Sequence, residues 1–151
     1  MTTALIPKDM TIHQLSIFLE NRSGTLIKVL DCLKKSNIQI IASAIADTAQ
    51  YGILRIICSD PRRAYLELEE AGIAVALSDV FAIELENKPG QAADAIKTFS
   101  DAGISITYMY SFLYGHQGIL VFRTDNTDEA REVILRNRLN SLTEKDLEQL
   151  G

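Results

Sequence analysis

The sequence predicts an α+β protein made of two βαββαβ units, and three observations lead to this fold class. The chain repeats itself without a gap at an offset of 66 positions, so that residues 21–26, Asn-Arg-Ser-Gly-Thr-Leu, return as residues 87–92, Asn-Lys-Pro-Gly-Gln-Ala. Within each copy, strand-like stretches of period two alternate with stretches of helical period. Each copy is near the lower limit for an independent core. We therefore expect two antiparallel four-stranded sheets, joined side by side into one eight-stranded sheet with the helices on one face.

The repeat extends well beyond these two short stretches. It pairs Ile17 with Ile83, Leu19 with Leu85, Glu20 with Glu86, Ile38 with Ile104, and Ile40 with Ile106. Matches that keep one offset indicate an internal duplication. We therefore predict an N-terminal arm at residues 1–11 and two domains, at residues 12–78 and 79–151.

The first half of the first copy predicts strand, helix and strand. Residues 12–20 alternate apolar and polar side chains, which is the period of a strand with one buried face. After the turn at residues 21–24, apolar side chains recur at helical spacing from Leu26 to Leu33. Asn37 tolerates the left-handed conformation at a helix end, and residues 38–46 are apolar on both faces. The second strand is therefore buried on both sides or paired at its edge.

The second half predicts strand, helix and strand again. Residues 51–58 form a third strand that makes a hairpin with the second. Asp60 and Pro61 start the second helix, because proline is preorganised for the first helical position. Gly72 ends this helix, and residues 73–77 make the fourth strand.

The second copy predicts the same order, with a weak last strand. Its strands fall at residues 80–86, 104–113 and 118–124, and its helices at residues 90–102 and 127–137. The segment from Leu139 to Leu142 is short of apolar residues, and Thr143 followed by acidic residues is a helix-start signal. We expect a short strand and a terminal helical turn. Two right-handed crossovers in each unit give the ferredoxin-like arrangement, in which helices cover one sheet face.

Composition and charge exclude several classes of protein. Hydrophobic residues make up 47% and charged residues 23% of the chain, as in an ordinary globular protein. No apolar run approaches the roughly 18 residues of a membrane span, and the first ten residues lack the apolar stretch of a secretory signal, so we expect a cytoplasmic protein without a membrane role. The net charge of −5 disfavours nucleic acid. Cys32 and Cys58 indicate reduced thiols, and we expect no metal and no cofactor.

The strand-loop-helix motif resembles that of the ACT domain family of small-molecule-binding regulatory modules. Glu20 to Leu26 precede Asn-Ile-Gln-Ile at residues 37–40, and Glu86 to Ala92 precede Gly-Ile-Ser-Ile at residues 103–106. The resemblance covers residues 12–142 and depends on two motifs in register. It implies a stand-alone tandem ACT protein that binds a free amino acid at the seam between units and is not itself an enzyme. Ser23 stands where the family more often has proline.

The two loops supply the candidate ligand-binding residues. Backbone N–H groups at a helix start lack intrahelical partners, and a glycine lets a carboxylate approach the backbone closely. The resemblance implies that each loop faces second-strand residues of the neighbouring unit. The candidates are Asn21, Arg22, Ser23, Gly24, Thr25, Leu26, Gln39, Asn87, Lys88, Pro89, Gly90, Gln91, Ala92, Ser105, Tyr108 and Tyr110.

We expect the two sites to be unequal. Pro89 removes one N–H donor from the second loop, whereas the first loop keeps all of its donors. Tyr108, Tyr110 and Phe112 occupy alternate positions of the second strand of copy two, where copy one has alanines. Two interpretations of these aromatics stay open, as core fillers or as the wall of a pocket. With the second interpretation, the first loop binds an amino acid with an aromatic or imidazole side chain.

Structural explanations and other functions stand beside this one. Asn, Ser and Gly are ordinary residues at a helix start, and Arg22 and Lys88 are equally consistent with solvated charges. An Arg in the first loop of a ferredoxin-like unit is similar to acylphosphatases, but no glycine-rich phosphate loop or catalytic constellation accompanies it. A regulatory subunit that acts only in complex with a biosynthetic enzyme is a further alternative. Single-stranded RNA binding is disfavoured by the acidic charge.

The same pattern leads to an expectation about assembly. The apolar strands at residues 38–46 and 104–113 would be exposed edges in isolated units, and such edges invite aggregation. We expect these two strands to pair or pack against each other within the chain, and the bare sheet face to be buried in a homodimer. The expected partners are the amino acid, a second copy, and an enzyme of amino-acid metabolism.

Overall fold

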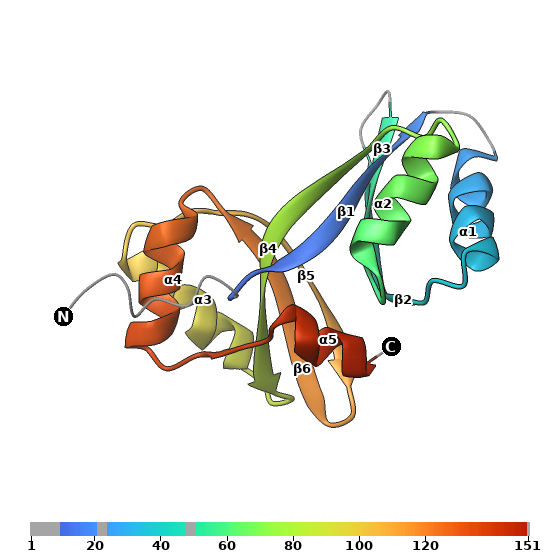
Figure 1. The fold of residues 1–151 in the computed structure, drawn as a ribbon. Helices are drawn as coiled ribbons and strands as arrows, with labels where there is room; N and C mark the ends of the chain where they lie inside the picture. Colours follow the sequence, from blue (N-terminus) through green and yellow to red (C-terminus); the bar gives the residue numbers. More distant parts are fainter. Residues whose placement is uncertain (1–9, 21–23, 48–50, 151) are drawn as a thin grey trace. The chain divides into compact units, whose positions relative to one another are not determined.

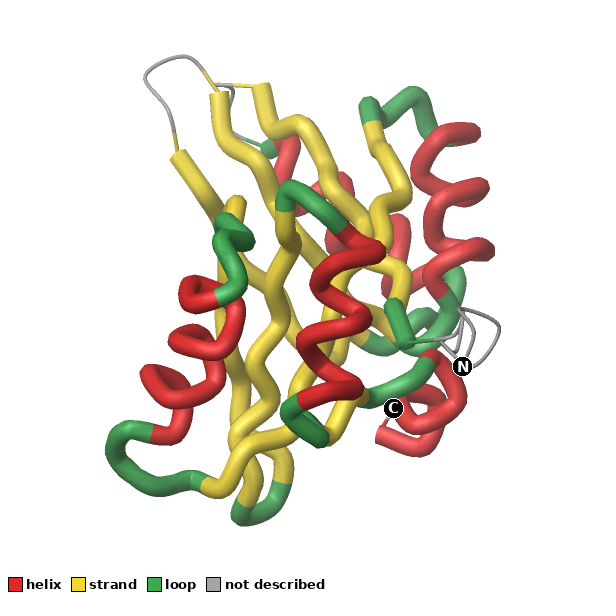
Figure 2. The backbone as a smooth tube through the Cα atoms, turned by 90° about the vertical axis from the view of Figure 1, so that its left-hand side faces the viewer, coloured by secondary structure: helices red, strands yellow, loops and turns green. Residues whose placement is uncertain are grey.

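The protein was analysed as a computed structural model, which describes residues 10–20, 24–47 and 51–150. These residues group into two compact units (Figure 1). The first unit contains residues 13–78 and 145–150, and the second unit contains residues 79–144 and 10–12. In both units the helices (red) pack along strands (yellow) in Figure 2.

The first unit has the predicted order of elements. These are β1 (Ile12–Glu20), α1 (Thr25–Lys35), β2 (Ile40–Asp47), β3 (Tyr51–Cys58), α2 (Pro61–Glu70) and the start of β4 (Val75–Glu86). Its hydrogen-bonded strand order is β2-β3-β1-β4, in which the Phe18 N–H donates to the Ala74 carbonyl at 3.0 Å. As expected, Asn37 has a positive φ of 56° where the first helix ends.

The second unit repeats this architecture. After β4 it contains α3 (Gln91–Asp101), β5 (Ile106–Tyr114), β6 (Gln117–Thr124), α4 (Thr127–Arg136) and β7 (Asn140–Ser141). β6 pairs with both β4 and β5, and β7 pairs with β4. The last strand has two residues and is followed by α5 (Glu144–Leu150), which confirms the expected short strand and terminal helix.

Strand β4 corrects the predicted strand count. The sequence led us to expect separate strands at residues 73–77 and 80–86, but Val75–Glu86 is one unbroken strand of 12 residues. The expected break falls at Ser78 and Asp79, where no glycine or proline forces a turn, so the extended backbone continues. The described residues therefore form seven strands rather than eight, and the α+β, ferredoxin-like fold class is otherwise confirmed.

The expected pairing of the two apolar strands with each other is wrong. Over the described residues, β2 is hydrogen-bonded to β3 and β5 to β6, and each stands at the end of its strand order. The physical reason is the continuity of β4, which leaves both second strands at edges.

Each unit has its own hydrophobic core on one sheet face. In the first unit, alternate residues of β1 and β3, such as Ile17 and Ile56, pack against Leu33 of α1 and Leu68 of α2. In the second unit, Phe122 lies with its ring centroid 5.6 Å from that of Phe81 and 5.0 Å from that of Phe99. The core of the second unit also contains Met10.

Four residues of the second sheet are buried without belonging to the core on its helix side. Val80, Ala82 and Val121 are 0% exposed, and Ile119 is 2% exposed. These values do not test the expected homodimer, which stays a proposal.

The helix starts differ in how they are capped. The Asp60 side chain accepts a hydrogen bond from the Arg63 N–H at 3.3 Å, and the Asn126 side chain accepts one from the Glu129 N–H at 3.0 Å. By contrast, the N-cap residue of α1 is Gly24 and that of α3 is Gly90, and neither helix has a side-chain cap.

We expect Asp60→Ala and Asn126→Ala each to lower the free energy of unfolding by about 1 kcal/mol, because each leaves helix N–H groups without a cap. Denaturant unfolding measures this. Glu132→Ala, at an exposed mid-helix position of α4, is the control. A cap variant as stable as this control would contradict the assignment of the caps.

Candidate functional site

The two predicted loops end at glycines in the left-handed region. Gly24 has a φ of 101° and Gly90 has a φ of 88°, and each is the N-cap of the helix that follows. A side chain at such a φ is strained, so glycine is required by the backbone itself. Both helices therefore present their first backbone N–H groups next to a loop that has no side-chain cap.

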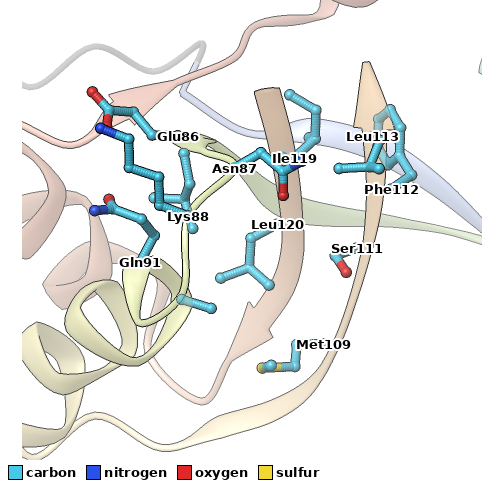
Figure 3. A pocket seen from close by; sticks show the side chains of 13 residues that line it. Glu86, Asn87, Lys88, Gln91, Met109, Ser111, Phe112, Leu113, Ile119 and Leu120 are labelled. Carbon is cyan, nitrogen blue, oxygen red and sulfur yellow. The ribbon is translucent and has the colours of Figure 1, made fainter. Parts of the chain in front are cut away.

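A pocket of about 300 Å³ lies beside the second loop, and we refer to it as the second-loop pocket. Its loop side is formed by Glu86, Asn87, Lys88, Gln91 and Ala92. Figure 3 shows Met109, Ser111 and Leu113 of the edge strand β5 on the other side. The floor comes from Leu85 of β4 and from Leu120 of β6.

The charged groups of this pocket stand together on the loop side. The Lys88 Nζ lies 3.0 Å from the Glu86 Oε2, and the two side chains are 69% and 61% exposed. An exposed ion pair contributes little to stability, roughly 0–1 kcal/mol. The pair therefore places an ammonium and a carboxylate on the loop side of the pocket, and little stability is lost if a ligand separates them.

A pocket of about 700 Å³ lies beside the first loop, and we refer to it as the first-loop pocket. It is lined by Glu20, Thr25 and Lys28 and by Gly72, Ile73 and Ala74 of the turn before β4, together with Phe18 and Gly24. The Phe18 ring is 51% exposed, and its centroid lies 5.1 Å from that of Tyr51. This pocket thus opens toward the fourth strand of its unit, whereas the second-loop pocket opens toward the second strand.

Several of the predicted site residues do line these pockets. Asn87, Lys88, Gln91 and Ala92 line the second-loop pocket, and Gly24 and Thr25 line the first. Leu26 is 38% exposed at the start of α1 and is not among the lining residues of either pocket, like Pro89 and Gly90. Asn21, Arg22 and Ser23 lie outside the described residues.

The predicted strand residues lie elsewhere. The backbone N–H of Gln39 donates to Ser59 Oγ at 3.0 Å, and that of Ser105 donates to Asp125 Oδ1 at 3.2 Å. Tyr108 and Tyr110 are half-buried on β5, outside the core cluster and outside the lining of both pockets. Their assignment to a ligand site stays a prediction.

Met109, Ser111 and Leu113 line the second-loop pocket although the sequence pattern did not indicate them, and Phe112 of the predicted aromatic set lines it as well. A register shift between Ile106 and Tyr108 changes which face of β5 the following residues occupy, and Met109 then pairs with the core residue Phe122. Residues paired directly across two strands share a face. The sequence shows that residues 109, 111 and 113 alternate with the aromatic residues 108, 110 and 112, so the two sets occupy opposite faces of the strand. The register shift determines which of the two sets is on the helix side of the sheet.

Other chemistry finds little support among the described residues. No group of three or more His, Cys, Asp or Glu side chains there could hold a metal ion. Burial and the nearby Glu67 raise the pKa of the Cys32 thiol, while Lys35 and Lys28 act in the opposite direction. A raised pKa leaves less of the nucleophilic thiolate. A search of the same residues for helices long and apolar enough to cross a bilayer finds none.

Comparison with known proteins now defines the class of this protein. The family model of the ACT domain pair matches residues 10–151, and the chain belongs to this family. The resemblance noted in the sequence is thereby confirmed. No curated protein matches the chain.

Solved structures agree with this family. Protein BT0572 from Bacteroides thetaiotaomicron is 42% identical with a TM-score of 0.87, and the match covers 92% of this chain and 96% of that chain. The ligand-free regulatory subunit of aspartate kinase from Thermus thermophilus is 15% identical with a TM-score of 0.59, covering 82% and 91%. The regulatory subunit of aspartate kinase from Thermus flavus is 17% identical with a TM-score of 0.57, covering 82% and 88%. The last two share the fold.

Proposed function

We propose that the protein is a regulatory protein that binds a free amino acid beside a glycine-capped helix start, without catalysing a reaction. The observation that carries this proposal is the second-loop pocket, which the Glu86–Lys88 pair lines together with a strand side that is apolar apart from Ser111. A free amino acid carries an ammonium and a carboxylate on one carbon atom, so one ligand is complementary to both members of the pair. The nearby helix start favours the carboxylate.

We propose the first-loop pocket as a second site, with an aromatic or imidazole amino acid as its ligand. The exposed Phe18 ring offers a planar surface for stacking, and Glu20 and Lys28 supply groups of both charges. The proposed ligand class is the one expected from the sequence for the first loop. The proposed stacking surface is Phe18 of the first unit rather than the expected Tyr108 and Tyr110.

The proposed mode of action is regulation through a partner in the cytoplasm. A regulatory subunit of aspartate kinase shares the fold, and we propose that this chain likewise acts on an enzyme of amino-acid metabolism, as a homodimer. Sedimentation at micromolar concentration tests the assembly, and a stable monomer would count against the dimer.

Thermal unfolding in the presence of each of the twenty amino acids tests the proposed ligand class. A ligand at about one hundred times its dissociation constant stabilises the folded state by about 2.7 kcal/mol. For a chain of this size that raises Tm by roughly 5–10 °C. We expect such a rise with at least one amino acid and none with its N-acetyl amide, which lacks both charges. No shift with any amino acid would overturn the proposal.

A further inference from the structure

We infer that the second-loop pocket selects a free amino acid with an apolar, aliphatic side chain, such as leucine, isoleucine, valine or methionine. This inference rests on the proposed function and names the ligand class of one site. It is carried by the walls of the pocket, by its volume and by a comparison of the two copies of the repeat.

The wall opposite the charged pair contains apolar side chains that remain exposed. Met109 is 50% exposed and Leu113 is 65% exposed on the edge strand β5, while Leu120 beneath them is buried. An aliphatic side chain placed here removes apolar surface of both partners from water, which is the main source of affinity for such ligands. Met109 is unbranched and flexible, so it adapts to ligands of slightly different shape.

The strand side of the pocket has no charged group. Its lining residues on β5 and β6 include one hydroxyl, that of Ser111, and are otherwise apolar or glycine. A ligand with a second charge would lose water at that charge without gaining a partner, which is costly. A volume of about 300 Å³ is at the lower end of the range of ligand pockets, roughly 300–1,000 Å³, and suits a small side chain. Aspartate, glutamate, lysine and arginine are therefore disfavoured.

The first copy of the repeat has different side chains at two positions that line this pocket in the second copy. At the offset of 66 positions, Leu26 takes the place of Ala92, and Asp47 takes the place of Leu113. Leu26 is larger than Ala92, and Asp47 brings a charge to the strand position where the second copy has an apolar residue. Among the described residues of the first unit that correspond to the lining of this pocket, Glu20 and Thr25 also line the first-loop pocket.

Isothermal titration calorimetry on the full chain tests the ligand class. We expect leucine or methionine to bind about fifty-fold more tightly than alanine, since each buried methylene contributes about fourfold in affinity. Glutamate and lysine should bind at least tenfold more weakly than leucine. Tighter binding of a charged amino acid would overturn this inference while leaving the proposed function in place. The absence of binding by every amino acid would overturn both.

A pair of substitutions on α3 tests whether leucine binds in the second-loop pocket. Ala92→Leu installs the residue of the first copy inside the pocket, and we expect it to weaken leucine binding at least tenfold. Ala93→Leu is the matched control, because Ala93 is also exposed on the first turn of α3 but does not line the pocket. We expect the control to stay within twofold of the unsubstituted chain. Equal binding by both variants would show that leucine binds elsewhere.

Ligands that lack either the carboxylate or the ammonium test the roles of Lys88 and Glu86 separately. We expect Lys88→Gln to weaken leucine about tenfold but to leave leucinamide, which lacks the carboxylate, unchanged. Glu86→Gln should weaken leucine but not 4-methylpentanoate, which lacks the ammonium. Equal losses for the complete and the truncated ligand in either variant would overturn the assignment of that side chain.

Discussion

Phe122→Ala is expected to lower the free energy of unfolding by about 3–5 kcal/mol, the largest stability effect predicted for this chain. Phe122 is 0% exposed, and its ring contacts those of Phe81 and Phe99. Removing it takes away buried apolar surface and leaves a cavity between β6, β4 and α3, which the remaining rigid side chains fill incompletely. In a chain of this size the loss corresponds to a fall in Tm of roughly 6–20 °C.

The control for this prediction is the same substitution at an exposed ring. Phe18 is 51% exposed and contacts the Tyr51 ring, so Phe18→Ala should cost about 1 kcal/mol or less. Denaturant unfolding of both variants measures the difference in midpoint. Comparable losses in the two variants would show that the three phenylalanine rings do not form the centre of the second core.

The repeat made the fold predictable from the sequence. Once Glu20 to Leu26 and Glu86 to Ala92 were aligned, most patterns in one copy had a second instance in the other, and the helices after Asp60 and Asn126 began where expected. The break expected near Ser78 was the exception. The residues before and after Ser78 both have the pattern of a strand. The local pattern does not distinguish one continuous strand from two consecutive strands separated by a turn.

The candidate site was predictable in part. The glycine loops follow from local backbone chemistry, and the structure places both glycines at positive φ. The opposite wall depends on the register shift before Tyr108, which is an irregularity of pairing between β5 and β6. A shift of one residue moves a whole set of side chains to the other sheet face, and it leaves no strong local signal. The sequence pattern therefore indicated the aromatic set, of which Phe112 lines the pocket, whereas Met109 and Leu113 are identified as lining residues only by the structure.

A pair of glycine substitutions, Gly24→Val and Gly90→Val, is expected to show which loop holds the ligand. Both glycines have positive φ, and among the described residues, chain neighbours aside, a Cβ added at either would meet no atom within 4 Å. The cost in stability therefore comes from the backbone alone, about 1–3 kcal/mol in each case, because a β-branched residue is strained at such a φ. Two variants with similar losses of stability can be compared directly for ligand binding.

We expect Gly90→Val to abolish binding of the aliphatic amino acid and Gly24→Val to leave that binding within about threefold. The strained residue 90 displaces the loop that carries Lys88 and the start of α3 that carries Gln91 and Ala92, so one side of the second-loop pocket is lost. Calorimetry with leucine on each variant, at a temperature where both remain folded, measures this. Gly52→Ala is a further control that should leave binding unchanged, since Gly52 lines neither pocket and a Cβ at this strand position makes ordinary contacts of 3.7 and 3.8 Å. If Gly24→Val abolishes binding and Gly90→Val does not, the first loop holds the ligand, and its larger number of N–H donors would be the physical reason.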